Sequence, residues 1–340
     1  MAKYSIKILT VLMLFLGLAG SAYAQNMDSV RYIVSPEVPG PNQQTIIEIQ
    51  GIGTFLGEST ITWTLNGKVA LTGPGETRFS FTTGSVGVTS RVRVTINSEF
   101  YGTISRDFAF TPTLITLLWE SDTSTPPLYP GKALYSPGSR IKVVAFPQVV
   151  ARGTTVTANN LSFRWSVNGE PVTAQSGKGR SSITFSGDQL RNSEVVSVDV
   201  FFDEVQVGRS TITIPGTAPS LIMYNRDPLR GTLYDQAFPP TVTLTANEMV
   251  LKAEPYYFSN ESMRSGSLSY TWLLNGNPTV GPDSQRGILT LRKTGSGAGE
   301  AQISVSLQNI DTSKFVQSAR AVLRILFGGG APDGSSSFGL

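Results

Sequence analysis

The sequence predicts an all-β protein made of three tandem antiparallel β-sandwich domains, and three observations predict it. A short alternating segment with a central Trp and a closing Asn-Gly occurs three times, as ITWTLNGK, SFRWSVNGE and SYTWLLNGN. The copies are separated by about the length of one small domain. Beyond residue 24 apolar and polar residues alternate in many short segments, and no segment keeps a helical period over three turns.

The tryptophans of these segments define the repeat. Trp63 and Trp165 are 102 residues apart, and Trp165 and Trp272 are 107 residues apart, which is the size of an immunoglobulin-like (Ig-like) sandwich. Apolar residues two positions before and after each Trp share its face of the strand. We therefore expect all three Trp side chains in the structural core. The alternative, that they stack on sugars at the surface, fits their position in the middle of an apolar strand face poorly.

Each Trp strand is followed by a turn signal and by further strands. Asn66-Gly67, Asn168-Gly169 and Asn275-Gly276 tolerate the positive φ of a tight hairpin turn. About thirty residues later each copy has a second alternating strand, RVRVTI, VVSVDVFF or AQISVSL, and then a closing strand.

The domain boundaries are predicted at two short proline-containing linkers. Thr-Pro-Thr at 111–113 and Thr-Ala-Pro at 217–219 interrupt the strand pattern. The expected domains are Ig-like domain 1 at 26–114, domain 2 at 115–219 and domain 3 at 220–327, followed by a disordered Gly/Ser-rich tail at 328–340. Such short linkers favour a semi-rigid rod over flexibly linked domains.

The first 24 residues have the pattern of a cleaved signal peptide. Lys3 and Lys7 precede the apolar run ILTVLMLFLGLAG, and Ala22-Tyr23-Ala24 forms an A-x-A cleavage signature. The expected location is therefore exported: periplasmic, cell-surface or extracellular. No transmembrane segment is expected after cleavage.

Composition excludes several classes of function. The chain has no Cys and no His, which removes thiol nucleophiles, Ser-His-Asp triads, disulfides and Cys/His zinc sites. After cleavage 25 basic residues face 24 acidic ones, a net charge of +1, which argues against nucleic-acid binding. The acids are scattered without a calcium-loop motif or an evident glycosidase pair. We expect no enzyme activity, no catalytic residues, no metal and no cofactor.

Two segments are candidates for contact with a ligand or partner. The aromatic stretch at 254–259 contains Tyr256, Tyr257 and Phe258, which would bind a glycan or peptide if exposed and coplanar, or would cap the end of the sandwich if buried. Phe338 and Leu340 end the tail in an apolar tripeptide that a partner groove could accept.

The Y/F-x-W-x-x-N-G strand and turn resemble the PKD-like and other Ig-like modules of bacterial exported proteins, although the W-D-F-G-D-G form of the PKD motif is absent. The resemblance implies location in the cell envelope or at the cell surface, and it implies no activity. The function expected from the sequence is a non-catalytic spacer, adhesion or assembly module. The alternative is a carbohydrate-binding protein that uses the aromatic residues near 254–259. The partner would be an envelope or surface protein, or a glycan.

Overall fold

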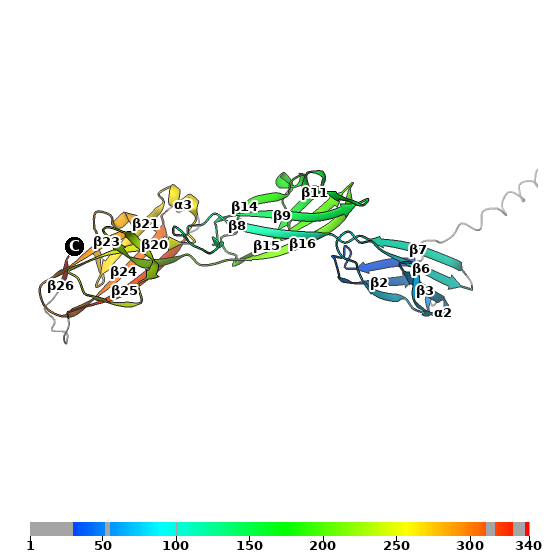
Figure 1. Ribbon diagram of the computed structural model, residues 1–340, viewed down its shortest axis with the longest axis horizontal. Helices are drawn as coiled ribbons and strands as arrows, with labels where there is room; N and C mark the ends of the chain where they lie inside the picture. Colours follow the sequence, from blue (N-terminus) through cyan, green and yellow to red (C-terminus); the bar gives the residue numbers. More distant parts are fainter. Residues whose placement is uncertain (1–29, 52–54, 100, 311–316, 329–336, 340) are drawn as a thin grey trace, which may run out of the picture. The chain divides into compact units, whose positions relative to one another are not determined.

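The computed structural model describes residues 30–51, 55–99, 101–310, 317–328 and 337–339. The predicted signal peptide, at 1–24, and Leu340 lie outside these residues. The regular secondary structure of the described chain is nearly all β-strand, with two short α-helices, α2 (Phe55–Glu58) and α3 (Asn260–Arg264). Its strands form six sheets that follow one another in pairs along the sequence, as the colour bands of Figure 1 show. The predicted fold class, tandem Ig-like β-sandwiches, is confirmed.

The first pair of sheets contains β1 to β7. One sheet has the order β1-β2-β5 and the other the order β4-β3-β6-β7. The strands are β1 (Val30–Ser35), β2 (Gln44–Gly51), β3 (Thr60–Leu65), β4 (Lys68–Pro74), β5 (Arg78–Thr82), β6 (Ser90–Ser98) and β7 (Gly102–Phe110).

The second pair contains β8 to β16. One sheet is β10-β9-β14, with β8 also paired to β9, and the other is β12-β11-β15-β16, with β13 also paired to β11. The strands are β8 (Leu114–Ser121), β9 (Arg140–Ala151), β10 (Thr154–Val156), β11 (Ser162–Val167), β12 (Glu170–Pro171), β13 (Gly177–Lys178), β14 (Ser182–Ser186), β15 (Ser193–Phe202) and β16 (Val205–Pro215).

The third pair contains β17 to β26. Its sheets have the orders β18-β17-β20-β23-β26 and β19-β25-β24-β21-β22. The strands are β17 (Ser220–Asp227), β18 (Gly231–Ala237), β19 (Thr241–Leu244), β20 (Glu248–Tyr256), β21 (Leu268–Leu274), β22 (Asn277–Thr279), β23 (Ile288–Thr294), β24 (Gly299–Asn309), β25 (Ser318–Phe327) and β26 (Ser337–Gly339).

Two features of the third pair differ from the prediction. The pairing of β19 with β25 is parallel, so this sheet is not wholly antiparallel. Within the tail predicted to be disordered, Ser337–Gly339 instead form β26, which pairs antiparallel with β23. Three residues are too few to show a strand pattern in the sequence. The strand forms because the outer edge of β23 offers main-chain groups to an extended segment that reaches it.

By the packing of its residues the chain divides into two compact units, one of 1–114 with 148–156 and one of 115–147 with 157–340. The second unit therefore contains most of the second sandwich and all of the third. The domain boundaries near 114 and 219 remain a prediction.

The three tryptophans lie in equivalent buried positions. Trp63 is fully buried, and Trp165 and Trp272 are 2 % exposed. Each indole Nε1–H donates to a main-chain carbonyl 12 to 15 residues further along the chain, that of Glu76 (2.8 Å), Arg180 (2.8 Å) or Ser284 (3.0 Å). The indole thus fills the space between the sheets and satisfies its one polar group on the loop that follows.

The Asn-Gly pairs form the expected turns, and the Asn side chain does more than tolerate the turn conformation. Asn66, Asn168 and Asn275 have φ of 51°, 53° and 49°, and the following glycines have φ of 81° to 86°. Each Asn exchanges two hydrogen bonds with a residue of the neighbouring long strand: its N–H donates to that residue's carbonyl, and its Oδ1 accepts from that residue's N–H. The partners are Arg91, Val195 and Gln302. The repeated Asn-Gly therefore pins the hairpin end to the next strand.

We expect Gly169→Val to destabilise the second domain by about 1–2 kcal/mol, because a β-branched residue resists positive φ. No atom lies within 4 Å of a Cβ built on Gly169, whose φ is +86°, so the cost would be backbone strain alone. Gly169→Asn is the matched control, since Asn adopts this conformation readily. Denaturant midpoints compare the two variants; equal midpoints would contradict the strain argument.

Candidate functional site

The aromatic stretch singled out in the sequence does not form an exposed platform. Tyr256, the last residue of β20, is 7 % exposed, and its hydroxyl lies 2.5 Å from that of Tyr224. Phe258 is fully buried in the core of the third sandwich. Tyr257 is half-buried, and its ring plane makes an angle of 72° with that of Tyr256. This geometry favours the interpretation that the stretch completes the end of the sandwich.

Tyr257 instead turns toward the loop that follows β8. Its φ is 61°, an uncommon value for a bulky side chain. Its hydroxyl lies 2.7 Å from the hydroxyl of Tyr129, and the two rings meet nearly edge to face. Tyr129 comes from the segment that the sequence assigns to the second domain. The candidate site is therefore a contact between the second and third sandwiches, inside one compact unit.

Main-chain pairing at Ser124 forms the centre of this contact, which we call the joint. The Ser124 N–H donates to the Phe258 carbonyl and its carbonyl accepts from the Tyr257 N–H, both at 2.7 Å. The Ser124 hydroxyl oxygen accepts from the Phe258 N–H at 3.0 Å and donates to the Pro255 carbonyl at 3.2 Å. Ser124 is 8 % exposed. A short piece of one sandwich thus pairs with the other as a strand would.

Charged and amide side chains extend the joint on both sides of this pairing. Asp122 accepts from Asn260 Nδ2 at 2.8 Å and from Arg264 at 3.1 Å. Gln317 is 3 % exposed; its Nε2 donates to Ser136 Oγ at 2.7 Å, and its Oε1 accepts from the Ser259 N–H at 2.8 Å. The joint therefore connects residues of the two sandwiches that are 128 to 181 positions apart in the sequence.

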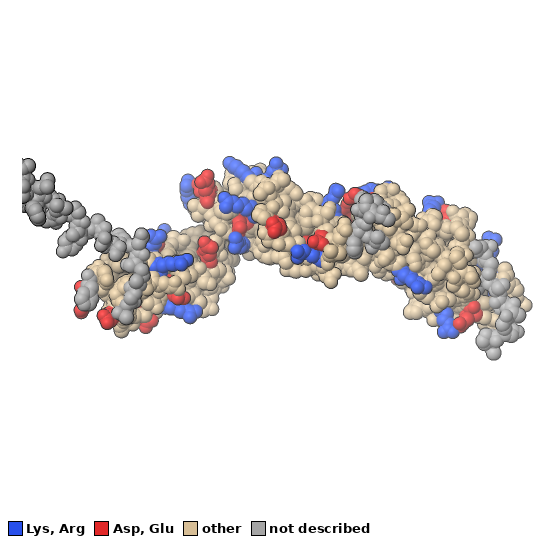
Figure 2. Space-filling view, turned by 180° about the vertical axis from the view of Figure 1, so that it is seen from behind, with Lys and Arg blue, Asp and Glu red and all other residues tan. Residues whose placement is uncertain are grey.

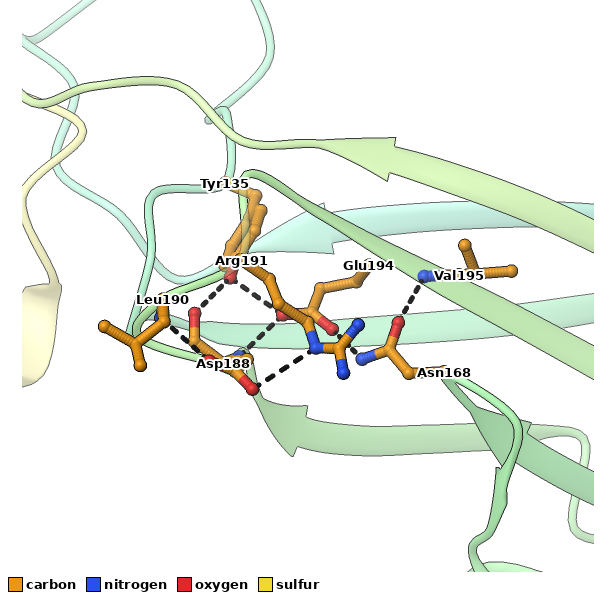
Figure 3. Close-up of polar contacts among 7 residues, drawn as sticks. All are labelled: Tyr135, Asn168, Asp188, Leu190, Arg191, Glu194 and Val195. Carbon is orange, nitrogen blue, oxygen red and sulfur yellow. Dashed lines mark hydrogen bonds and ion pairs between the residues drawn. The ribbon is translucent and has the colours of Figure 1, made fainter.

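The second sandwich contains a buried carboxylate that contacts the segment between β8 and β9, the same segment that supplies Ser124 (Figure 3). Glu194, at the start of β15, is 1 % exposed. Its carboxylate accepts from the Tyr135 hydroxyl at 3.0 Å, from the Asp188 N–H at 2.6 Å and from Asn168 Nδ2 at 2.5 Å. All three donors are neutral. This arrangement replaces the water that a carboxylate loses on burial with fixed hydrogen bonds.

Glu194 connects three separate segments: the loop before β9, the loop before β15 and the Asn168 turn. The Tyr135 carbonyl also accepts from the Thr217 N–H at 2.7 Å, next to the predicted boundary at 219. In the first and third sandwiches the residue at the equivalent position, just before the partner of the turn Asn, is Ser90 or Ala301. Sequence reasoning missed Glu194, and aligning the three copies on their Asn-Gly turns would have found it.

Burial raises the pKa of several tyrosines in this region. Desolvation is the largest cause for Tyr135, Tyr256 and Tyr270, and hydrogen bonding to Glu194 raises the pKa of Tyr135 further. Desolvation and the hydrogen bond with Tyr129 raise the pKa of Tyr257 to about 12. All four phenols therefore remain neutral well above their ordinary pKa of 10.0.

These shifts predict alkaline destabilisation. A phenol whose folded-state pKa exceeds its unfolded value stabilises the fold fully below about pH 10, and this contribution is lost as pH rises through the folded pKa. We expect the free energy of unfolding to fall above about pH 10. Denaturant titrations at several pH values measure the slope, and Tyr135→Phe should make it shallower. Tyr101→Phe, at a side chain that is 64 % exposed, should leave the slope unchanged.

Other candidate chemistry is sparse in the described part of the chain. Those residues contain no group of three or more acidic, His or Cys side chains placed to hold a metal ion. Within the same ranges no helix is long and apolar enough to cross a membrane. On the face drawn in Figure 2, basic and acidic side chains are interspersed. A polar pocket of about 200 Å³ beside the joint is lined in part by Gln189, Glu261 and Gln317.

The predicted tail contacts are only partly described. Phe338 lies in β26, opposite Lys293 of β23. Leu340 is outside the described residues, so its proposed contact stays a prediction.

No protein-family model and no curated protein matches the sequence. Among solved structures, the chain is similar to arrays of fibronectin-III-like and Ig-like modules. The fibronectin(III)-like modules of Clostridium thermocellum CbhA match at 10 % identity and a TM-score of 0.27, over 55 % of this chain and 94 % of theirs. The central fibronectin-III array of RIM-binding protein matches at 12 % identity and a TM-score of 0.28, over 90 % and 99 %. A 1.5-MDa bacterial ice-binding adhesin matches at 10 % identity and a TM-score of 0.22, over 88 % and 98 %.

Proposed function

We propose that this chain is an exported, non-catalytic protein of the cell envelope or cell surface, in which tandem β-sandwich domains act as a spacer, adhesion or assembly module. The joint at Ser124 is the observation that supports this proposal most directly. A spacer must keep its domains in a set orientation under load, and flexible linkers do not do so. Main-chain pairing between two sandwiches resists bending because it must break before the domains can move apart.

The buried carboxylate supports the same role. Glu194 accepts a hydrogen bond from Tyr135 and so holds it in place. Tyr135 lies in the long segment between β8 and β9, which also contains Ser124 and Tyr129. That segment supplies one half of the joint, so its fixed conformation lowers the entropy lost when the joint forms.

Localisation tests the proposed class of function. Cells that produce the protein would be fractionated, and intact cells would be treated with a protease that cannot enter them. We expect the chain in the envelope fraction or the medium, and cleavage from outside if it reaches the surface. A chain that stays in the cytoplasm would contradict the proposal.

A distance measurement tests the joint. Because the chain has no Cys, spin labels can be placed on Glu170→Cys and Asn277→Cys, at exposed positions in the second and third sandwiches. We expect one narrow distance distribution, and a broad one after Asp122→Ala and Ser124→Gly are added. The control is Asp199→Ala, which breaks an ion pair of 2.5 Å with Arg209 elsewhere in the second sandwich. A distribution that is already broad without the joint variants would refute the role of the joint.

Carbohydrate binding through residues 254–259 remains the alternative from the sequence. The burial of Tyr256 and Phe258 does not favour it.

A further inference from the structure

The outer edge of β23 is a strand-accepting surface. The Lys293 N–H donates to the Asn247 carbonyl at 2.9 Å, so the main-chain groups of Lys293 face β20. Along a strand the main-chain N–H and C=O groups of successive residues point to alternate sides. The main-chain groups of Arg292 and Thr294 therefore face the side away from β20. That side is where β26 lies, with Arg292 opposite Gly339 and Thr294 opposite Ser337.

The second sandwich covers the corresponding edge by a different device. There β14 pairs with β9 as β23 pairs with β20. The carboxamide of Gln175 accepts from the Thr184 N–H and donates to the Thr184 carbonyl, both at 2.8 Å. One side chain thus makes the two hydrogen bonds that a neighbouring strand would make. In the third sandwich a segment from the end of the chain makes this pairing.

The pairing of β26 is short enough to open. Within the described residues 337–339, Ser337 and Gly339 direct main-chain groups at β23, and each main-chain hydrogen bond contributes little net free energy. What favours it is the covalent link to Phe327 through nine residues, 328–336. A short link of this kind gives an effective concentration on the order of 1 mM. The same segment of another chain competes once its local concentration is similar.

We propose that β26 is an exchangeable strand. The edge of β23 binds Ser337–Gly339 of its own chain in the monomer, and it binds the same segment of a second copy where chains are crowded. The third domain then links copies of the chain by strand addition, in which main-chain hydrogen bonds supply the affinity. This inference concerns β23 and β26 alone and is independent of the joint and of the proposed function.

Engineered cysteines test both halves of the proposal, since the chain has none of its own. Lys293 and Phe338 face each other as a pair without mutual hydrogen bonds, the arrangement in which Cβ atoms are closest and a disulfide can form. In the full mature chain, Lys293→Cys with Phe338→Cys should form a disulfide within one chain under mild oxidation. The control, Lys293→Cys with Gly339→Cys, places the second thiol on the opposite strand face and should cross-link at least about tenfold more slowly.

Exchange is tested by mixing two single variants, Lys293→Cys and Phe338→Cys, at a concentration of about 1 mM. We expect a mixed disulfide dimer on a non-reducing gel, formed at least about tenfold faster than with Gly339→Cys as the second chain. If the double variant cross-links no faster than its control, β26 does not occupy β23. If the mixed dimer forms no faster than its control, the strand does not exchange between copies. Either result would overturn the proposal.

Discussion

Trp165→Ala is expected to unfold the second sandwich, with a loss of about 3–5 kcal/mol in the free energy of unfolding. Two terms add to this loss. The substitution leaves a cavity in place of an indole that is 2 % exposed and stacks with the Phe163 ring. It also leaves the Arg180 carbonyl without the indole N–H that it accepts at 2.8 Å. This loss is a large part of the stability of a typical domain.

The measurement is hydrogen exchange of the chain without residues 1–24, which reports the opening of each sandwich separately. We expect protection to fall in β11 and β15 and to persist in β3 and β6. Trp119→Ala is the control in the same domain, because Trp119 is only half-buried. The Lys132 ammonium lies over the Trp119 ring, with Nζ 3.2 Å from the ring centroid. That contact is worth about 0.5–1 kcal/mol. Unchanged protection in the Trp165 variant would remove Trp165 from the core.

Glu194→Ala should destabilise the second sandwich by about 1–3 kcal/mol, because it removes an acceptor that three donors share. The Asp188 N–H and Asn168 Nδ2 would lose this partner, and the buried Tyr135 hydroxyl would keep only the Asp188 carbonyl, at 3.1 Å. Alanine occupies the equivalent strand position in the third sandwich. The substitution is therefore compatible with the strand backbone at this position. The cost arises from the donors that the second sandwich directs at this position.

A triple variant isolates that cost. Glu194→Ala combined with Tyr135→Phe and Asn168→Gly removes two of the three donors, and glycine keeps the positive φ of the turn. We expect it to lose less stability than the sum of its three single variants, as measured from denaturant midpoints. Additive losses would mean that the three side chains do not act as one hydrogen-bonded group.

The repeated part of the architecture could be predicted from the sequence alone. The two-residue alternation around Trp63, Trp165 and Trp272 identifies a core face, because side chains on a strand point alternately to opposite sides. Asn-Gly identifies the hairpin that follows, because few residue pairs tolerate two consecutive positive φ values. Both signals are local, and three copies of them establish a tandem array of sandwiches.

What binds the second and third sandwiches into one unit could be decided only by the tertiary structure. Ser124 and Gln317 are ordinary polar residues whose partners in the other sandwich lie 131 to 181 positions away, and no local pattern connects such positions. The aromatic stretch at 254–259 shows the same limit: its composition suits a binding surface or a packed end equally well. The positive φ of Tyr257 and the burial of its neighbours decide between them, because backbone direction in a loop depends on what the loop packs against.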